Sequence, residues 1–175
     1  MGHTVLAVPV VALEDEVRER TAYYDPSYVS ADPAFVHAHI TILAPWVPSP
    51  TVADLAAVAA LAAAADPIVA TFSEVSAFPD NGLIHLRPEP DDAFRALSAA
   101  FAQRYPGFPP YAGEFADPVP HLTLDHPAGG VTQSDVRDRV AGLLPITCTL
   151  DRLDLQWWAE DDCRLLRSWQ FGAPP

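Results

Sequence analysis

A six-residue pattern that occurs twice constrains this chain more than any other feature. The first copy reads Ala-His-Ile-Thr-Ile-Leu over residues 38–43, and the second reads Pro-His-Leu-Thr-Leu-Asp over residues 120–125. Apolar and polar residues alternate in both, which is typical of a half-buried strand. Side chains two positions apart on a strand share a face, so His39 accompanies Thr41 and His121 accompanies Thr123. The sequence therefore predicts two short strands that each present an imidazole and a hydroxyl together.

The segments around the two copies also correspond, which indicates an internal duplication. Each copy is followed by a loop and a helix start of the same form, Thr51-Val-Ala-Asp54 and Thr132-Gln-Ser-Asp135, close to a capping box. A strand, a helix and a loop precede each copy, and the pattern repeats with an offset of about 80 residues. We predict one two-lobed domain over 1–175, with repeat units at approximately 4–76 and 83–154 and a closing strand over 163–171.

Further elements follow from local patterns. Residues 67–77 and 82–87 are expected to pair as a hairpin around Asn81-Gly82, and residues 145–153 form a β-rich run. Residues 91–104 predict an amphipathic helix. The helix expected over 51–65 is almost entirely Ala, Leu and Val, so it is either buried or faces a partner chain. The long Pro-rich loop over 105–120 has the character of a functional lid.

The charge of the chain favours a small ligand. The formal net charge is −13, and all ten basic residues other than histidine are arginines. Proteins that grip long nucleic acids usually carry a basic stripe, because phosphate neutralisation supplies most of their non-specific affinity. No such stripe is visible in this sequence. A ligand with a single phosphate is easier to reconcile with an acidic surface.

The cellular compartment is predicted from the lack of membrane-spanning and secretory signals and from the few cysteines. No apolar run approaches the length of a membrane-spanning helix, and the first residues lack the basic start of a secretory leader. The only cysteines, Cys148 and Cys163, are expected in the two strands of a C-terminal hairpin and are interpreted as reduced thiols. We therefore expect a cytoplasmic protein that is a monomer or a weak dimer and has no membrane partner.

The paired motifs resemble a known superfamily. Two His-apolar-Thr-apolar motifs about 80 residues apart, each in a duplicated α/β half, look like the two-histidine (2H) phosphoesterases. Within them, the chain is most similar to the branch of 2'-5' RNA ligases and 2',3'-cyclic phosphodiesterases, from the Val5 strand to the Phe171 strand. The resemblance implies a duplicated, two-lobed α+β fold. Two antiparallel sheets flanked by helices would form a central groove that carries both His-x-Thr strands.

The same resemblance implies a chemistry. His39 and His121 would be the catalytic proton-transfer pair, while Thr41 and Thr123 would bind the phosphate. An imidazole titrates near neutral pH, so one ring can start neutral and the other protonated, and hydroxyls can donate hydrogen bonds to phosphate oxygens. We expect a metal-independent phosphodiesterase, without a cofactor, that hydrolyses a 2',3'-cyclic nucleotide or a similar small cyclic phosphodiester. In relatives the N-terminal histidine is often the acid, an assignment that reverses with reaction direction.

The expected partner is a small nucleotide or cyclic phosphate, with RNA ends as a further candidate and no extended nucleic-acid surface. Candidate substrate contacts are His37, Tyr24, Trp46, Tyr111 and Phe115. His37 precedes His39 by two residues, so it either borders the groove or is a solvated residue at the entrance of the strand. Trp46 either packs on the following helix or walls the pocket.

Other histidines and aromatic residues receive structural interpretations. His85 is expected to be an ordinary strand residue. By parity, His126 falls on the face opposite His121. Trp157 and Trp158 are assigned to core packing.

Two other classes of function remain open at this stage. The chain is alternatively a non-catalytic binding module for a phosphorylated nucleotide or metabolite, because folds outlast activities. A metal site built from His37, His39 and His121 with an added carboxylate is the other alternative, since neutral imidazoles are good ligands. It would give the repeated threonines no role.

Overall fold

A computed structural model describes residues 2–115 and 117–173 and shows a mixed α+β fold. The α-helices are α1 (Glu14–Tyr24), α2 (Val52–Ala63), α3 (Asp92–Arg104) and α4 (Gln133–Val140). The strands are β1 (His3–Pro9), β2 (His39–Leu43), β3 (Ile68–Phe72), β4 (Val75–Ala77), β5 (Ile84–Leu86), β6 (Leu122–Asp125), β7 (Ile146–Leu150), β8 (Arg152–Trp158) and β9 (Arg164–Gln170). Short 3-10 helices cover η1 (Val11–Leu13), η2 (Pro26–Tyr28), η3 (Pro110–Gly113) and η4 (Pro127–Gly129).

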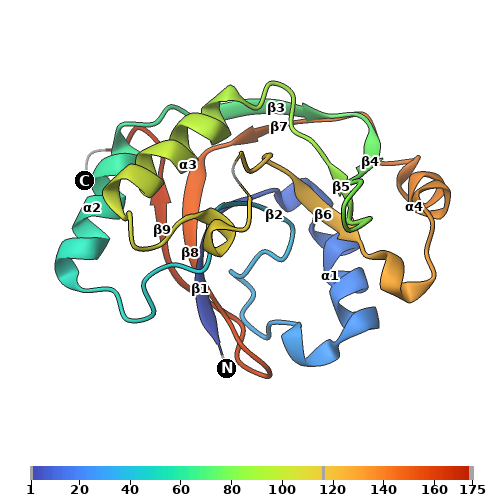
Figure 1. Ribbon diagram of the computed structural model, residues 1–175, viewed down its shortest axis with the longest axis horizontal. Coiled ribbons are helices and arrows are strands. Elements are labelled where there is room, and N and C mark those ends of the chain that lie inside the picture. The colour runs from blue at the N-terminus through green and yellow to red at the C-terminus, as the bar shows by residue number, and fades with distance from the viewer. Residues whose placement is uncertain (1, 116, 174–175) are drawn as a thin grey trace.

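Two antiparallel sheets organise these elements, as expected. The larger has the strand order β4-β5-β6-β2-β1-β8-β9, and the smaller pairs β3 with β7. β2 and β6 are neighbours near the centre of the larger sheet, with β1 beside β2 and β5 beside β6 (Figure 1). Helix α3 packs against β2, and α1 packs against β6. The two predicted motif strands therefore lie side by side where the halves of the sheet meet.

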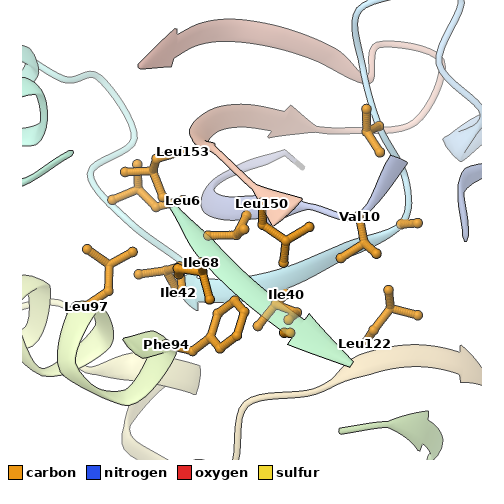
Figure 2. Close-up of a cluster of buried hydrophobic side chains, with 14 of the residues drawn as sticks. Leu6, Val10, Ile40, Ile42, Ile68, Phe94, Leu97, Leu122, Leu150 and Leu153 are labelled. Atoms are coloured by element: carbon orange, nitrogen blue, oxygen red, sulfur yellow. The ribbon is translucent and has the colours of Figure 1, made fainter. Parts of the chain in front are cut away.

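The hydrophobic core lies between the two sheets. Even-numbered residues of β2 and β6 face it, as do apolar residues of β1, while the small sheet and α3 cover it from the other side. Figure 2 shows these side chains meeting in one cluster that includes Leu6, Ile40, Ile42, Ile68, Phe94, Leu97, Leu122 and Leu150. All eight are buried. Because successive strand residues point to opposite faces, this burial directs His39 and Thr41 of β2, and Thr123 of β6, away from the core.

Both predicted capping boxes are present. The Thr51 hydroxyl accepts the Asp54 amide, and the Asp54 carboxylate accepts the Thr51 amide; Thr132 and Asp135 make the same pair of bonds. Helix α2 is only partly buried, with Val58 and Ala62 as its buried residues. It packs against β9 and α3. One side of the helix therefore packs internally, and the rest of its apolar surface is half-buried or exposed.

The hairpin expected over 67–77 and 82–87 is wrong in its first strand. This run is split into β3, which pairs with β7, and β4, which pairs with β5. Buried positions explain the split: Ile68, Ala70 and Phe72 are buried at even numbers, whereas Val75 is buried at an odd number. The chain must turn at the exposed Ser73-Glu74 to keep burying its apolar side chains.

The β-rich run over 145–153 divides in the same way, and this corrects the placement of the cysteines. Leu150 ends β7 buried at an even position, and Leu153 is buried at an odd position in β8. The C-terminal hairpin is therefore β8–β9. Cys148 lies outside it in β7, and Cys163 lies at its turn; both are free thiols. Within the described residues, no helix is both long and apolar enough to cross a bilayer.

Candidate active site

The two motif strands bring their polar faces together. β2 and β6 are antiparallel, with Ile40 paired to Leu122. Stepping one residue along each strand from this pair places His39 across from Thr123, and Thr41 across from His121. Each histidine therefore lies close to the hydroxyl of the other motif as well as its own. This crossed arrangement surrounds one point with two imidazoles and two hydroxyls.

All four side chains line one cavity of about 370 Å³, the histidine cavity. Its walls also include residues of α1, the loop after it, and the end of β8. The further lining residues with polar or aromatic side chains are Arg20, Thr21, Tyr24, Asp25, Tyr28, His37, Asp125, His126 and Trp158. The cavity thus combines a polar floor from the sheet with aromatic walls. That combination suits a ligand with a phosphate and a flat ring.

The same local contact orients both motif histidines. His39 Nδ1 lies 2.7 Å from the His37 carbonyl, and His121 Nδ1 lies 2.8 Å from the Val119 carbonyl. A carbonyl oxygen can only accept, so Nδ1 carries the proton in each ring. In the neutral form this leaves Nε2 as the basic nitrogen. Both rings are therefore held in the same tautomer, with the same atom available to exchange a proton.

The surroundings favour the neutral form of both rings. Burial lowers the pKa of His39 to about 4, an effect that the His37 carbonyl partly opposes and that His121 reinforces. Burial also lowers the pKa of His121, where the Val119 carbonyl again opposes it and His85 and Arg87 add to it. Desolvation penalises a charged imidazole until an anion compensates for it. A bound phosphate would supply that compensation.

The two threonines differ in exposure. Thr123 is exposed, and it lies across from His85 of β5. Thr41 is half-buried, and its side chain contacts the Tyr111 hydroxyl. Burial raises the pKa of Tyr111 to about 12, which keeps that hydroxyl protonated. Both threonines border the histidine cavity, so each hydroxyl can reach a ligand there.

His37 is a buried structural residue, and its interpretation as a solvated strand residue is wrong. It is 2% exposed. Its Nδ1 lies 2.6 Å from Glu14 Oε1, and its Nε2 accepts the Ser30 amide at 3.1 Å. Glu14 also accepts the Ala38 amide at 2.9 Å. Because both ring nitrogens are engaged, His37 is unsuited to ligate a metal, although its ring borders the histidine cavity.

Tyr24 lines the histidine cavity and also contacts a buried ionic cluster centred on Asp125. Its hydroxyl donates to Asp125 and lies 2.8 Å from the His126 carbonyl. Asp125 has a side chain with no exposed surface and pairs with Arg20 at 2.9 Å and Arg139 at 2.8 Å. The cluster fixes α1 and α4 to the end of β6. Tyr24 therefore has both a structural contact and a place on the cavity wall.

The remaining predicted contacts divide between a cavity and the core. Tyr111 and Phe115 line a second cavity beside His121, with the Tyr111 ring 6.0 Å from the His121 ring. Trp46 is only 1% exposed and packs edge-on against Tyr105 at 5.3 Å. It lines neither histidine-bearing cavity. The expectation that Trp46 walls the pocket is therefore wrong, because its large ring is more stable in the core.

The assignment of Trp158 to core packing and of His126 to the face opposite His121 is wrong, because both residues line the histidine cavity. Trp158 borders the histidine cavity with its ring 5.5 Å from that of His39. His126 also borders it, because β6 ends at Asp125 and strand parity no longer applies beyond that point. His85, expected to be structural, is buried and stacked on Phe78 at 3.9 Å, with its ring 5.6 Å from that of His121. Over residues 2–115 and 117–173, no group of three or more His, Cys, Asp or Glu side chains is arranged to hold a metal ion.

Solved structures share this fold over nearly their whole length. E. coli LigT in its apo form is 14% identical, with a TM-score of 0.56 and 96% of both chains covered. E. coli LigT complexed with 3'-AMP is 16% identical, with a TM-score of 0.53, 97% of this chain and 98% of that chain covered. The protein TT0787 of Thermus thermophilus is also 16% identical, with a TM-score of 0.53 and 98% of both chains covered. At these identities the likeness establishes the fold.

The sequence itself supplies the family. No curated protein matches this chain significantly. The family model described as the 2'-5' RNA ligase superfamily matches residues 9–162, a range that includes both His-x-Thr motifs. The chain therefore belongs to the 2'-5' RNA ligase superfamily of two-histidine phosphoesterases.

Proposed function

We propose that the protein is a metal-independent phosphodiesterase that hydrolyses a 2',3'-cyclic nucleotide or a similar small cyclic phosphodiester. The arrangement of His39 and His121 carries this proposal. Both rings have Nδ1 fixed by the carbonyl two residues earlier, and both border the same cavity. Two equivalent imidazoles on either side of one point suit in-line displacement at phosphorus, which needs a base and an acid on opposite sides.

The reaction would proceed in one step that couples two proton transfers to the displacement at phosphorus. Nε2 of the neutral imidazole accepts a proton from water, and the water oxygen forms a bond to phosphorus. The bond between phosphorus and one ribose oxygen breaks, and that oxygen takes a proton from Nε2 of the other, protonated imidazole. The hydroxyls of Thr41 and Thr123 donate hydrogen bonds to the non-bridging oxygens, where charge develops.

The walls and the charge support a mononucleotide-sized substrate. Trp158, Tyr24 and Tyr28 offer aromatic surface for a base in the histidine cavity. The net charge of −13 disfavours a long polyanion. E. coli LigT, which shares this fold, has been crystallised in complex with 3'-AMP, a nucleotide of this size. RNA ends remain a second candidate substrate, held through their terminal nucleotide.

Turnover of 2',3'-cyclic nucleotides in the presence of EDTA tests the proposal. We expect activity in the wild-type protein, and we expect His39→Ala and His121→Ala each to lower kcat by about 10²–10⁴-fold, the usual contribution of a positioned acid or base. His3→Ala, an exposed residue at the start of β1, serves as the matched control with unchanged activity. Circular dichroism of each variant confirms that the fold is retained.

The outcomes separate the proposal from its rivals. Activity that EDTA abolishes would contradict a metal-independent reaction. A wild-type protein that binds the nucleotides without turning them over, with both histidine variants weakening the binding, would instead establish a non-catalytic binding module. Identification of the product as a 2'- or a 3'-phosphate would show which ester bond breaks.

A further inference from the structure

A second cavity lies against His121 and is not used by the proposed reaction. This aromatic cavity has a volume of about 360 Å³, and His121 is the one residue that it shares with the histidine cavity. It is lined by three aromatic rings and three carboxylates, contributed by Phe78, Tyr111, Phe115, Asp80, Glu114 and Asp117. A group bound there would therefore lie on the opposite side of His121 from the nucleotide.

The aromatic walls pack against one another and against His121. The rings of Tyr111 and Phe115 meet edge-on at 5.7 Å, and the ring of Phe78 meets His121 edge-on at 5.0 Å. The Tyr111 amide donates to the Ala44 carbonyl at 2.9 Å, and its hydroxyl contacts Thr41. Tyr111 holds a left-handed backbone with φ of 52°, a conformation that is uncommon for an aromatic residue. These contacts specify the position of its ring.

The described residues that line this cavity carry more carboxylates than basic groups. Within the described residues, Asp117 pairs with Arg95 at 3.1 Å, whereas Asp80 and Glu114 form no ion pair with an arginine or histidine. Among the described residues His121 is the one basic side chain in the lining, and the Arg87 guanidinium lies near it outside the lining. The lowered pKa of His121 makes its ring neutral at neutral pH. A second phosphate would be repelled here, so this side of the site disfavours a continuing RNA chain.

We infer that the aromatic cavity binds a small organic cation, a quaternary or N-alkylated ammonium group. Aromatic faces attract such cations through their quadrupoles, and nearby carboxylates add Coulomb attraction. A quaternary ammonium has no N–H groups, so it needs the aromatic surface and few hydrogen-bond partners. Combined with the proposed function, on which this consequence rests, the substrate would be a phosphodiester that carries a positive group on its His121 side.

Binding can be measured without any turnover. Choline and its neutral isostere 3,3-dimethylbutan-1-ol are titrated into the full chain at constant ionic strength and followed by NMR chemical-shift changes. We expect choline to perturb resonances of Phe78, Tyr111 and Phe115, and to bind about threefold to tenfold more tightly than the isostere, as cation–π attraction at a partly exposed site predicts. Equal affinity of the two probes, or shifts confined to other parts of the molecule, would overturn the inference.

Two variants locate the site, and one serves as a control. Phe115→Leu removes an aromatic face, and Glu114→Gln removes a charge while preserving shape; both residues are exposed, so the fold should be unaffected. Each is expected to weaken choline binding about twofold to fivefold and to leave the isostere unchanged. Glu74→Gln neutralises an exposed carboxylate outside the cavity and should bind choline as the wild type does. Unchanged choline affinity in Phe115→Leu and Glu114→Gln would contradict the assignment.

The two proposals can fail separately. His39→Ala is expected to lose cyclic-nucleotide turnover and to keep its choline affinity, because His39 does not line the aromatic cavity. Choline binding in a wild-type protein without turnover would refute the phosphodiesterase and support the cation site. Turnover without a preference for choline over the isostere would do the reverse.

Discussion

At the scale of single residues, the site is defined by two half-buried imidazoles whose charged forms are disfavoured by desolvation. A reaction that needs one neutral and one protonated ring proceeds best between the two pKa values. Burial lowers the pKa of His39 to about 4, and it holds the pKa of His121 below its ordinary value. The singly protonated free site is therefore most populated in acid, below the ordinary histidine pKa of about 6.5.

This difference predicts two distinct pH profiles. We expect kcat/KM, which reports the free site, to peak below pH 6.5 or so and to fall about tenfold per pH unit above it. The profile of kcat should lie at higher pH, because the bound phosphodiester anion favours the imidazolium and raises its pKa. Steady-state kinetics from pH 4 to 9 on a 2',3'-cyclic nucleotide, with protein stability checked at each pH, measures both. A kcat/KM that is highest above pH 7 would contradict the effect of burial.

Strand parity was sufficient to predict which motif side chains share a face. It rests on local geometry alone, so it located His39 with Thr41 and His121 with Thr123 before any pairing was known. The same parity places Asp125 on that face. Its partners Arg20 and Arg139 come from two different helices, and no local sequence pattern predicts that these side chains meet. Trp158 reaches the cavity through the pairing of β8 with β1, which is equally non-local.

At the scale of elements, Asp125 joins helices α1 and α4 to β6. Burial by itself would raise the pKa of this carboxyl, but hydrogen bonds from Tyr24, the His126 amide and the two arginines hold its pKa below the ordinary value. A lowered pKa means that the ionised cluster stabilises the fold above the unfolded-state pKa near 3.9, and that this stabilisation is lost as the pH falls through the lower folded value.

Removal of this charge should loosen both helices. Asp125→Asn keeps the shape of the side chain but leaves two guanidinium groups without their buried partner. We expect the free energy of unfolding to fall by about 3–5 kcal/mol, as for other broken buried ion pairs. Urea denaturation at pH 7 measures the loss. Asp66→Asn, at an exposed position after α2, is the control and should change stability by less than about 0.5 kcal/mol. A similar small change in Asp125→Asn would show that the cluster contributes little.

The helix starts were predictable and the strand partners were not, for a physical reason. A capping box depends on residues three apart, so the sequence around Thr51 and Thr132 predicted where their helices begin. The partner of β3 is β7, which the chain supplies only after α4. The run 67–77 therefore resembled one strand of a local hairpin. The switch in buried parity between Phe72 and Val75 was the available signal that it divides.

At the scale of the whole molecule, the acidic charge acts against the ligand that the site would bind. The net charge of −13 repels an anionic nucleotide, and Arg20, an arginine that lines the histidine cavity, is itself paired with Asp125. Salt screens this repulsion: the Debye length falls from about 30 Å at 0.01 M to about 8 Å at 0.15 M. Added salt should therefore assist binding. Proteins that neutralise RNA phosphates with a basic surface behave in the opposite way.

We expect kcat/KM for a 2',3'-cyclic mononucleotide to rise about twofold or more between 0.01 M and 0.15 M KCl at fixed pH, with most of the change in KM, because screening alters encounter and binding of the anion. An RNA oligonucleotide with a 2',3'-cyclic end, which carries more negative charge, should show a steeper rise from a lower starting value. Initial-rate measurements over this salt range decide the sign. A kcat/KM that falls linearly with the logarithm of salt concentration would reveal a basic RNA-binding surface, and the preference for a small substrate would then be wrong.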